Sequence, residues 1–244
     1  MSRTGRPFAF VVTCEHARNA VPSRYRGCFA GNEAALQSHH GYDAGALEMA
    51  RALARALEAP LFDAQVSRLL VDVNRSPGHP RLYSEAVRQL PAQARGEIRE
   101  AYYEPIRAQA EQAIRQAASA GKRVVHLSSH SFTPMLDGVE RTADVGLLYD
   151  PKRVGEVALC KHWQRELAER LPDLRVRRNY PYRGTSDGFT AYLRRRLSGA
   201  RYVGVELEIN QRIMTAGGVA WRTLRRTLIA ALQAALAAED ATRA

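Results

Sequence analysis

Residues 8–16 read Phe-Ala-Phe-Val-Val-Thr-Cys-Glu-His, an apolar run that ends in polar side chains. A short apolar run of this kind is typical of a strand buried in a parallel sheet. Similar runs follow along the chain, and segments with helical periodicity separate them. This alternation predicts an α/β fold, a three-layer α/β/α sandwich on a mostly parallel or mixed sheet.

The remaining elements follow from the same two periodicities. Strands are expected at 69–73, 124–128, 145–149, 174–177 and 202–209, and helices at 45–57, 95–120, 154–170, 190–197 and 219–238. Pro105 should kink or split the long helix, because proline has no N–H to donate. No linker separates these elements, so residues 1–244 are expected to form a single domain.

The composition limits the classes of function. The net charge is +11, but the basic residues are almost all arginine and are spread along the chain. We therefore expect a small anionic substrate rather than a nucleic acid. No apolar run is long enough to span a bilayer, and no secretory signal is visible at residues 1–7. Three cysteines without a Cys-x-x-Cys pair predict free thiols and a cytoplasmic protein.

Residues 67–77 read Ser-Arg-Leu-Leu-Val-Asp-Val-Asn-Arg-Ser-Pro. The apolar run 69–73 predicts a second buried strand that ends in Asn74 and Arg75. An amide beside a guanidinium at the rim of a sheet suits a carboxylate ligand, because arginine binds carboxylates through two parallel hydrogen bonds. Asp72 is expected to pair with a neighbour such as Arg68 rather than to take part in chemistry.

Polar side chains end the other strands as well. His16 follows the first strand, His130 follows the strand at 124–128, and the strand at 202–209 carries Glu206 and Glu208. In a parallel sheet these ends face one crevice. Imidazole and carboxylate ligands suit Zn²⁺, and a nearby glutamate can take a proton from a zinc-activated water. Glu206 and Glu208 lie on the same face of their strand, so either can be the base.

Six motifs resemble, in order, those of the N-formylglutamate amidohydrolase family. They are Thr-Cys-Glu-His-Ala at 13–17, His-Gly-Tyr-Asp-Ala-Gly-Ala at 40–46, Ser-Arg-Leu with Asp-Val-Asn-Arg at 67–75, His-Ser-Phe-Thr-Pro at 130–134, Asn-Tyr-Pro-Tyr-Arg-Gly at 179–184 and Glu-Leu-Glu-Ile at 206–209. The resemblance runs from about residue 8 to 215. The family in turn resembles the zinc carboxypeptidases, which implies a phosphorylase/hydrolase-like fold.

The resemblance implies a role for each matching residue. His16 and His130 correspond to zinc ligands, and Glu208 corresponds to the base that activates water. Asn74 and Arg75 correspond to the pair that holds the α-carboxylate of the substrate. Glu208 is preferred over Glu206 because it fits the family position.

The third zinc ligand does not follow from the carboxypeptidase pattern. That pattern has a glutamate three residues after the first histidine, where this chain has Asn19. Asp43 is preferred, because an acidic residue after His-Gly-Tyr belongs to the family pattern. The alternatives are that Asp43 caps the following helix and that Glu15 is the ligand.

The expected activity is zinc-dependent hydrolysis of the N-acyl amide, expected to be N-formyl, of a small acidic amino acid such as N-formyl-L-glutamate. Arg68 and Arg183 are candidates for binding the carboxylate at the other end of the substrate. One alternative is a different N-acyl amino acid or a peptide-like substrate. Another is a metal-free protein on the same fold that binds anions or nucleic acid, because a fold does not determine a function.

Overall fold

The computed structural model describes residues 8–241. Within that range six strands form one sheet in the order β2-β1-β3-β8-β6-β7. They are β1 (Phe8–Cys14), β2 (Leu61–Asp63), β3 (Arg123–Phe132), β6 (Val145–Leu148), β7 (Val176–Arg178) and β8 (Tyr202–Asn210). The strands β2, β1, β3 and β8 are parallel, whereas β6 is antiparallel to β8 and parallel to β7. The sheet is therefore mixed and mostly parallel, as predicted.

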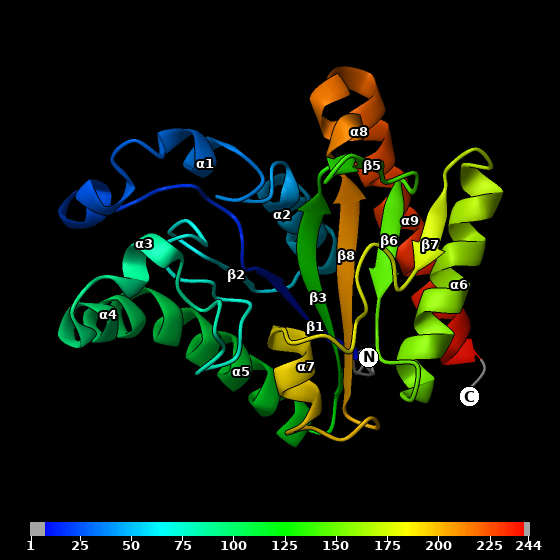
Figure 1. Ribbon diagram of the computed structural model, residues 1–244. Helices are drawn as coiled ribbons and strands as arrows, with labels where there is room; N and C mark the ends of the chain where they lie inside the picture. Colours follow the sequence, from blue (N-terminus) through cyan, green and yellow to red (C-terminus); the bar gives the residue numbers. More distant parts are fainter. Residues whose placement is uncertain (1–7, 242–244) are drawn as a thin grey trace.

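Helices cover both faces of this sheet and complete the predicted three layers (Figure 1). On one face α2 (Ala46–Leu57), α6 (Val154–Arg170) and α9 (Gly218–Ala241) enclose the largest apolar core. On the other face α5 (Glu104–Ser119) and α7 (Phe189–Arg194) form a second core. Neighbouring residues such as Val11 and Val12 belong to different cores, because successive side chains of a strand point to opposite faces.

The long helical stretch is split, as Pro105 predicted. It consists of α4 (Ala92–Ile98), a π-helical turn (Arg99–Tyr103) and α5. Pro105 lies at the start of α5, where its missing N–H removes no helical hydrogen bond. The π-helical turn therefore interrupts the α-helical hydrogen-bond pattern just before the proline.

The prediction of a strand at 69–73 was wrong. These residues form irregular turns, and the edge strand next to β1 is the short β2, which was not predicted. Leu70, Val71 and Val73 are nevertheless buried. They pack in a third apolar cluster with Tyr25, Phe29, Ala64, Val66, Leu82, Val87, Ile98 and Tyr103. A short apolar run indicates burial, and here irregular structure provides it.

The remaining elements lie around the carboxyl ends of the parallel strands. They are a 3-10 helix (Ser23–Phe29), α1 (Glu33–Gln37), α3 (Glu85–Arg88), α8 (Gln211–Ala216) and a hairpin of β4 (Met135–Leu136) and β5 (Val139–Glu140). In Figure 1, α1, α3 and α4 lie together to one side of the sheet, beyond β2. No helix in residues 8–241 is long and apolar enough to cross a membrane.

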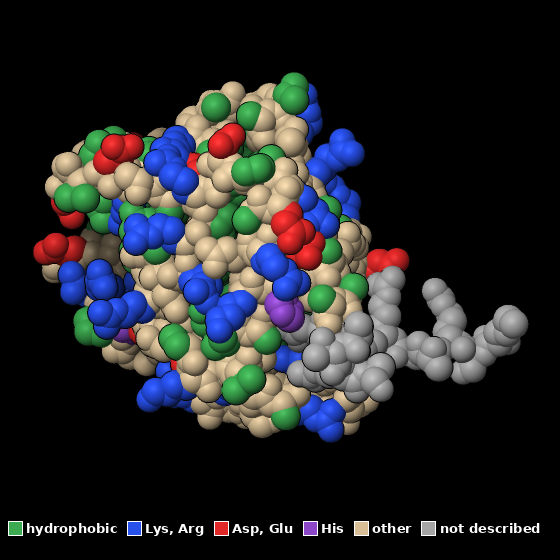
Figure 2. Space-filling view, turned by 90° about the vertical axis from the view of Figure 1, so that its right-hand side faces the viewer, with side chains coloured by type: hydrophobic (Ala, Val, Ile, Leu, Met, Phe, Trp, Pro, Cys, Tyr) green, Lys and Arg blue, Asp and Glu red, His purple; other side chains and the backbone are tan. Residues whose placement is uncertain are grey.

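The surface shown in Figure 2 carries many basic side chains. Lys and Arg are dispersed there among acidic and apolar side chains rather than gathered into a single patch. This face lies over the α6 side of the molecule, away from the carboxyl ends of β1 and β3. The groups that can carry chemistry are concentrated elsewhere, at those strand ends.

Candidate active site

The predicted site residues come together in one cleft of about 700 Å³. Its lining includes His16, Asp43, Arg68, Asn74, Arg75, His130, Arg183 and Glu208, together with Glu206. The volume lies within the range of small-molecule sites. The cleft therefore unites residues that are up to 192 positions apart in the sequence (208 − 16).

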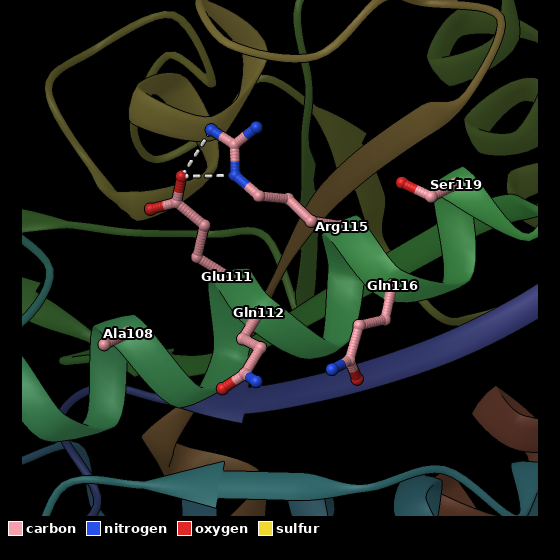
Figure 3. Close-up of a pocket in the computed structure, with 6 residues that line it drawn as sticks. All are labelled: Ala108, Glu111, Gln112, Arg115, Gln116 and Ser119. Atoms are coloured by element: carbon pink, nitrogen blue, oxygen red, sulfur yellow. Dashed lines mark hydrogen bonds and ion pairs between the residues drawn. The ribbon is translucent and has the colours of Figure 1, made fainter.

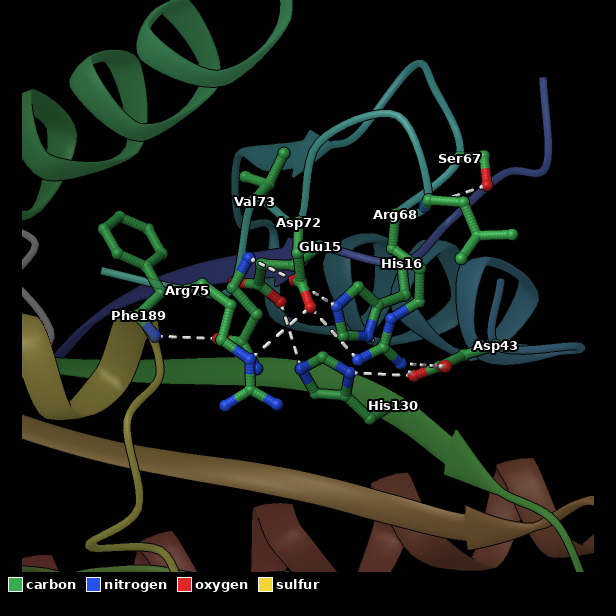
Figure 4. Close-up of polar contacts among 12 residues, drawn as sticks. Glu15, His16, Asp43, Ser67, Arg68, Asp72, Val73, Arg75, His130 and Phe189 are labelled. Atoms are coloured by element: carbon green, nitrogen blue, oxygen red, sulfur yellow. Dashed lines mark hydrogen bonds and ion pairs between the residues drawn. The ribbon is translucent and has the colours of Figure 1, made fainter. Parts of the chain in front are cut away.

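His16, Asp43 and His130 form the centre of this cleft, and we call them the His-Asp-His group. One potential ligand atom of each lies within 4.8 Å of the other two, and all three side chains are buried. Nδ1 of His16 lies 3.3 Å from Oδ2 of Asp43, and Nδ1 of His130 lies 2.9 Å from the same oxygen. Figure 4 shows both imidazoles beside Asp43. The group could hold a metal ion.

The backbone fixes this group from two directions. His130 lies within β3, which is longer than predicted and extends to Phe132. His16 follows β1, and its carbonyl accepts a hydrogen bond of 2.9 Å from the backbone N–H of Asp43. The cap of α2 is Gly45, at φ 73°, and no side chain caps this helix. The alternative that Asp43 caps the helix is therefore excluded.

The outer nitrogen of each histidine also meets a carboxylate. Nε2 of His16 lies 2.7 Å from Oδ1 of Asp72, and Nε2 of His130 lies 3.2 Å from Oε2 of Glu15. The hydroxyl of Ser128 donates to Glu15 and lies 2.9 Å from Nε2 of His130. Metal-binding histidines almost always have such outer partners, which orient the ring. Glu15 thus lies at the outer nitrogen of His130, opposite the nitrogen that faces Asp43.

The charges of these groups are strongly coupled. Burial alone would lower the pKa of His130, but hydrogen bonds to Asp43 and Glu15 hold it well above the usual value. Burial would raise the pKa of Glu15, yet His130 lowers it to about 2. The pKa values of Asp43 and Asp72 are likewise held below their usual range by neighbouring His16, despite burial. The centre of the cleft therefore favours positive charge.

Glu208 is a buried carboxylate on β8, directly opposite His130 of the His-Asp-His group. It pairs with His130 across β3 and β8. Burial raises the pKa of Glu208 to about 8; Asp43 and Glu206 add to the rise, and His130 opposes it. Its Oε2 has no hydrogen-bond partner among the described residues. Glu206, by contrast, accepts a hydrogen bond from the hydroxyl of Thr190. Glu208 is therefore the freer of the two carboxylates.

Asn74 and Arg75 line the cleft from an irregular turn instead of from a strand end. The Asn74 side-chain oxygen accepts a hydrogen bond of 2.7 Å from the backbone N–H of Phe189, which leaves the amide N–H groups of Asn74 for a ligand. Arg75 donates to the carbonyl of Asp187 at 3.0 Å and lies 3.5 Å from Asp72. Asp187 also accepts hydrogen bonds from the backbone and hydroxyl of Ser76. The turn is thus tied to the loop before α7.

The other two predicted arginines differ from each other. Arg68 pairs with Asp72 at 3.1 Å, as expected, and approaches Asp43 at 3.5 Å. Arg183 is exposed at the rim and forms no ion pair with another described residue. Of the two, only Arg183 is free of a carboxylate partner within residues 8–241.

Four contributors to the site were missed by sequence reasoning. Asp72 was expected to pair with Arg68, but its bond to His16 was not foreseen because 69–73 was assigned to a strand. Ser128, Thr190 and Asp187 act through hydrogen bonds to other side chains. Nothing in their local sequence distinguishes them from ordinary polar residues.

A second hollow lies along α5 and is lined by residues of that helix alone (Figure 3). Its two charged side chains, Glu111 and Arg115, pair with each other at 2.6 Å. A binding site needs polar groups that converge from several elements. This hollow has none, so the cleft at the strand ends is the stronger candidate.

Comparisons with known proteins agree with this architecture. The sequence pattern of the N-formylglutamate amidohydrolase family matches residues 8–215. Gene product Atu2144 from Agrobacterium tumefaciens is similar in structure, with a TM-score of 0.81 and 28% identity over 95% of this chain and 91% of that chain. An N-formylglutamate amidohydrolase from Ralstonia eutropha JMP134 shares the fold, with a TM-score of 0.70 and 20% identity over 94% of this chain and 93% of that chain. No curated protein matches. The chain belongs to the N-formylglutamate amidohydrolase family of hydrolases.

Proposed function

We propose that this protein is a zinc-dependent amidohydrolase that removes the N-formyl group from a small acidic amino acid such as N-formyl-L-glutamate. The products are formate and the free amino acid. The observation that carries the proposal is that the His-Asp-His group, a free buried carboxylate and an Asn-Arg pair line one cleft. We further propose a single catalytic domain in the cytoplasm, where three free cysteines would remain reduced.

The His-Asp-His group suits zinc in its ligand types and spacing. Tetrahedral ligands at 2.0–2.1 Å from zinc lie roughly 3.3 Å from one another. The two Nδ1 atoms lie 3.3 and 2.9 Å from Oδ2 of Asp43. Glu15, Asp43 and Asp72 are buried carboxylates whose pKa values lie below the usual range, and their negative charge favours a divalent cation. Zinc bound here would polarise the formyl carbonyl and lower the pKa of a water molecule.

The protein itself binds the substrate and moves the proton. Asn74 and Arg75 hold the α-carboxylate, and Arg68 or Arg183 binds the side-chain carboxylate. Glu208 acts in its ionised form, which a cation held by the His-Asp-His group would favour over the protonated form. Its carboxylate takes a proton from the attacking water, whose oxygen bonds to the formyl carbon. When the C–N bond breaks, Glu208 returns that proton to the leaving nitrogen, which gives formate and the amine.

A larger N-acyl amino acid is the second candidate. Besides the charged groups, the cleft is lined by the apolar side chains of Leu69, Phe132 and Leu136. These could contact an acyl group longer than formyl. The same ligands, base and carboxylate clamp would then act on a different substrate.

A panel of N-formyl and N-acetyl amino acids, assayed with zinc-loaded enzyme, tests both candidates. We expect the highest kcat/KM for N-formyl-L-glutamate and at least about 10-fold less for N-formyl-L-glutamine, which has the same shape without the side-chain charge. Turnover of apolar N-formyl amino acids alone would contradict the substrate but leave the chemistry intact. No turnover of any member would contradict the proposed enzyme activity.

A further inference from the structure

Residues 73–76, which we call the clamp turn, carry Asn74 and Arg75 but belong to no strand. A turn outside a sheet has no ladder of backbone hydrogen bonds, so other groups must bind its polar atoms. The structure provides them from α5 and from the π-helical turn before it. These two elements contribute nothing else to the site.

Two buried side chains bind the carbonyl groups of the clamp turn. Arg107 donates to the carbonyl of Val73 at 2.8 Å and to that of Arg75 at 3.2 Å. The hydroxyl of Tyr103 donates to the carbonyl of Arg75 at 2.7 Å. Arg107 is 5% exposed and Tyr103 is 3% exposed. The backbone of Arg75 is therefore held by two donors that water does not replace.

Arg107 is an unusual choice for this task. Its Nη2 has no hydrogen-bond partner among the described residues. Instead, its guanidinium lies over the rings of Tyr103, Phe189 and Tyr192, at 5.1, 4.3 and 4.5 Å from their centroids. A buried charge is costly, and stacking on aromatic rings offsets part of that cost. The free energy spent on burying the charge of Arg107 is consistent with a functional need for a rigid clamp turn.

The opposite side of the clamp turn is held by the loop before α7. Phe189 contacts both sides, since its backbone N–H binds Asn74 and its ring lies under Arg107. Figure 4 shows Phe189 beside the turn that carries Arg75. The turn is thus enclosed between two elements that are distant in sequence.

The helical spacing of the two donors explains how they reach the same target. Tyr103 is the last residue of the π-helical turn, and Arg107 follows four residues later in α5. Residues four apart lie on one face of a helix. Single π-helical turns in proteins are often found at functional sites.

We propose that Tyr103 and Arg107 are positioning residues that fix the Arg75 guanidinium for the α-carboxylate of the substrate. The inference rests on the proposed function, because it requires Arg75 to bind that carboxylate. Misplacement of the Arg75 guanidinium would weaken the paired hydrogen bonds that it makes with a carboxylate, because these bonds require a fixed geometry. Loss of the Tyr103 or the Arg107 donor should therefore weaken the recognition of the substrate α-carboxylate.

The test compares N-formyl-L-glutamate with its α-carboxamide, which has the same shape and no α-charge. The zinc-loaded wild type should prefer the acid by roughly 100-fold in kcat/KM, and Arg75→Gln should abolish the preference. Tyr103→Phe should reduce the preference about 5-fold through KM, with kcat nearly unchanged. Arg107→Met should reduce it further, and Arg107→Lys should restore part of it.

Ile98→Val is the matched control. Ile98 is buried in the same apolar cluster as Val73 and Tyr103 but makes no side-chain hydrogen bond, so the substitution loosens the cluster without removing a donor. It should leave the preference unchanged. Equal losses on both substrates in Tyr103→Phe and Arg107→Met would overturn the inference and leave the proposed function standing. A wild type that does not distinguish the two substrates would instead contradict the proposed role of Arg75 and, with it, the inference.

Discussion

His130 and Glu208 lie on adjacent strands of the sheet, whereas Asn74 and Arg75 lie on a turn outside it. The first pair is aligned by the hydrogen bonds of the β3–β8 ladder. The second pair is aligned by side chains, namely Arg107, Tyr103 and Asp187. One cleft thus combines a half that is held by backbone pairing in the sheet with a half that is held by buried polar side chains. We expect the sheet half to govern metal binding and proton transfer, and the turn half to govern substrate recognition.

The largest effect should follow from Glu208→Gln in the sheet half. Glutamine cannot take a proton from water, so kcat should fall by about 10³-fold or more. Zinc affinity should change little, because Glu208 is not part of the His-Asp-His group. Steady-state formate release and zinc titration would measure the two quantities.

Glu206→Gln is the matched comparison for that substitution. Glu206 lies two residues away on the same strand but is bound by Thr190. It should retain at least about a tenth of the activity. If Glu208→Gln stays active while Glu206→Gln does not, the base is Glu206.

The second effect is a fall in the free energy of unfolding at acid pH, and it arises from a histidine of the sheet. His126 in β3 is fully buried and bonded to Thr13 and Tyr202 at 2.8 and 2.7 Å. Burial lowers its pKa from 6.5 to about 4. Between these values the unfolded chain binds a proton at this residue and the folded chain does not. Stability should therefore fall by about 3 kcal/mol as the pH drops from 6.5 to 4.

His126→Gln isolates this contribution, since glutamine can form hydrogen bonds but does not titrate. Urea unfolding of both proteins at pH 7 and at pH 4.5 measures how much the free energy of unfolding of each protein changes with pH. The variant should lose less stability than the wild type over this interval. The same loss in both proteins would show that His126 is not the cause.

The third effect falls where the two halves meet. Asp72 binds His16 of the sheet half, Arg75 of the clamp turn and also Arg68. Asp72→Asn should weaken zinc binding about 10- to 100-fold, as for other outer partners of metal-binding histidines. It should also reduce the preference for the α-carboxylate. If Asp72→Asn changes only the zinc affinity or only the preference for the α-carboxylate, Asp72 does not couple the two halves.

The smallest effect should come from Ser76→Ala in the turn half. Its hydroxyl donates to Asp187 at 2.5 Å, and losing one such bond costs about 1 kcal/mol. KM should rise a few-fold for N-formyl-L-glutamate, while zinc affinity stays constant. A large loss of zinc affinity in this variant would contradict the division into two halves.

The two halves also differ in how far the sequence predicts them. Apolar runs with polar ends located β1, β3 and β8, and these strands position His16, His130 and Glu208. Asn74 and Arg75 were predicted to line the site and do so, but from a turn instead of a strand. The apolar residues at 69–73 indicated burial without indicating regular structure, because an apolar run reports burial and not backbone conformation.

Tyr103 and Arg107 carry no local signal of their contacts. In the sequence they are an aromatic and a basic residue within a helical stretch. Their role depends on how α5 packs against the clamp turn, which only the tertiary structure gives. The same is true of Asp187, whose partner Ser76 is 111 residues away.

Titration of metal-stripped protein with Zn²⁺, with formate release from N-formyl-L-glutamate measured at each step, tests whether the cleft is a zinc-dependent amidohydrolase site. Activity should rise linearly to one equivalent of zinc per chain and then remain constant, and His130→Ala should show neither tight binding nor activity. Formate release that does not depend on zinc, or one tightly bound zinc without formate release, would contradict it.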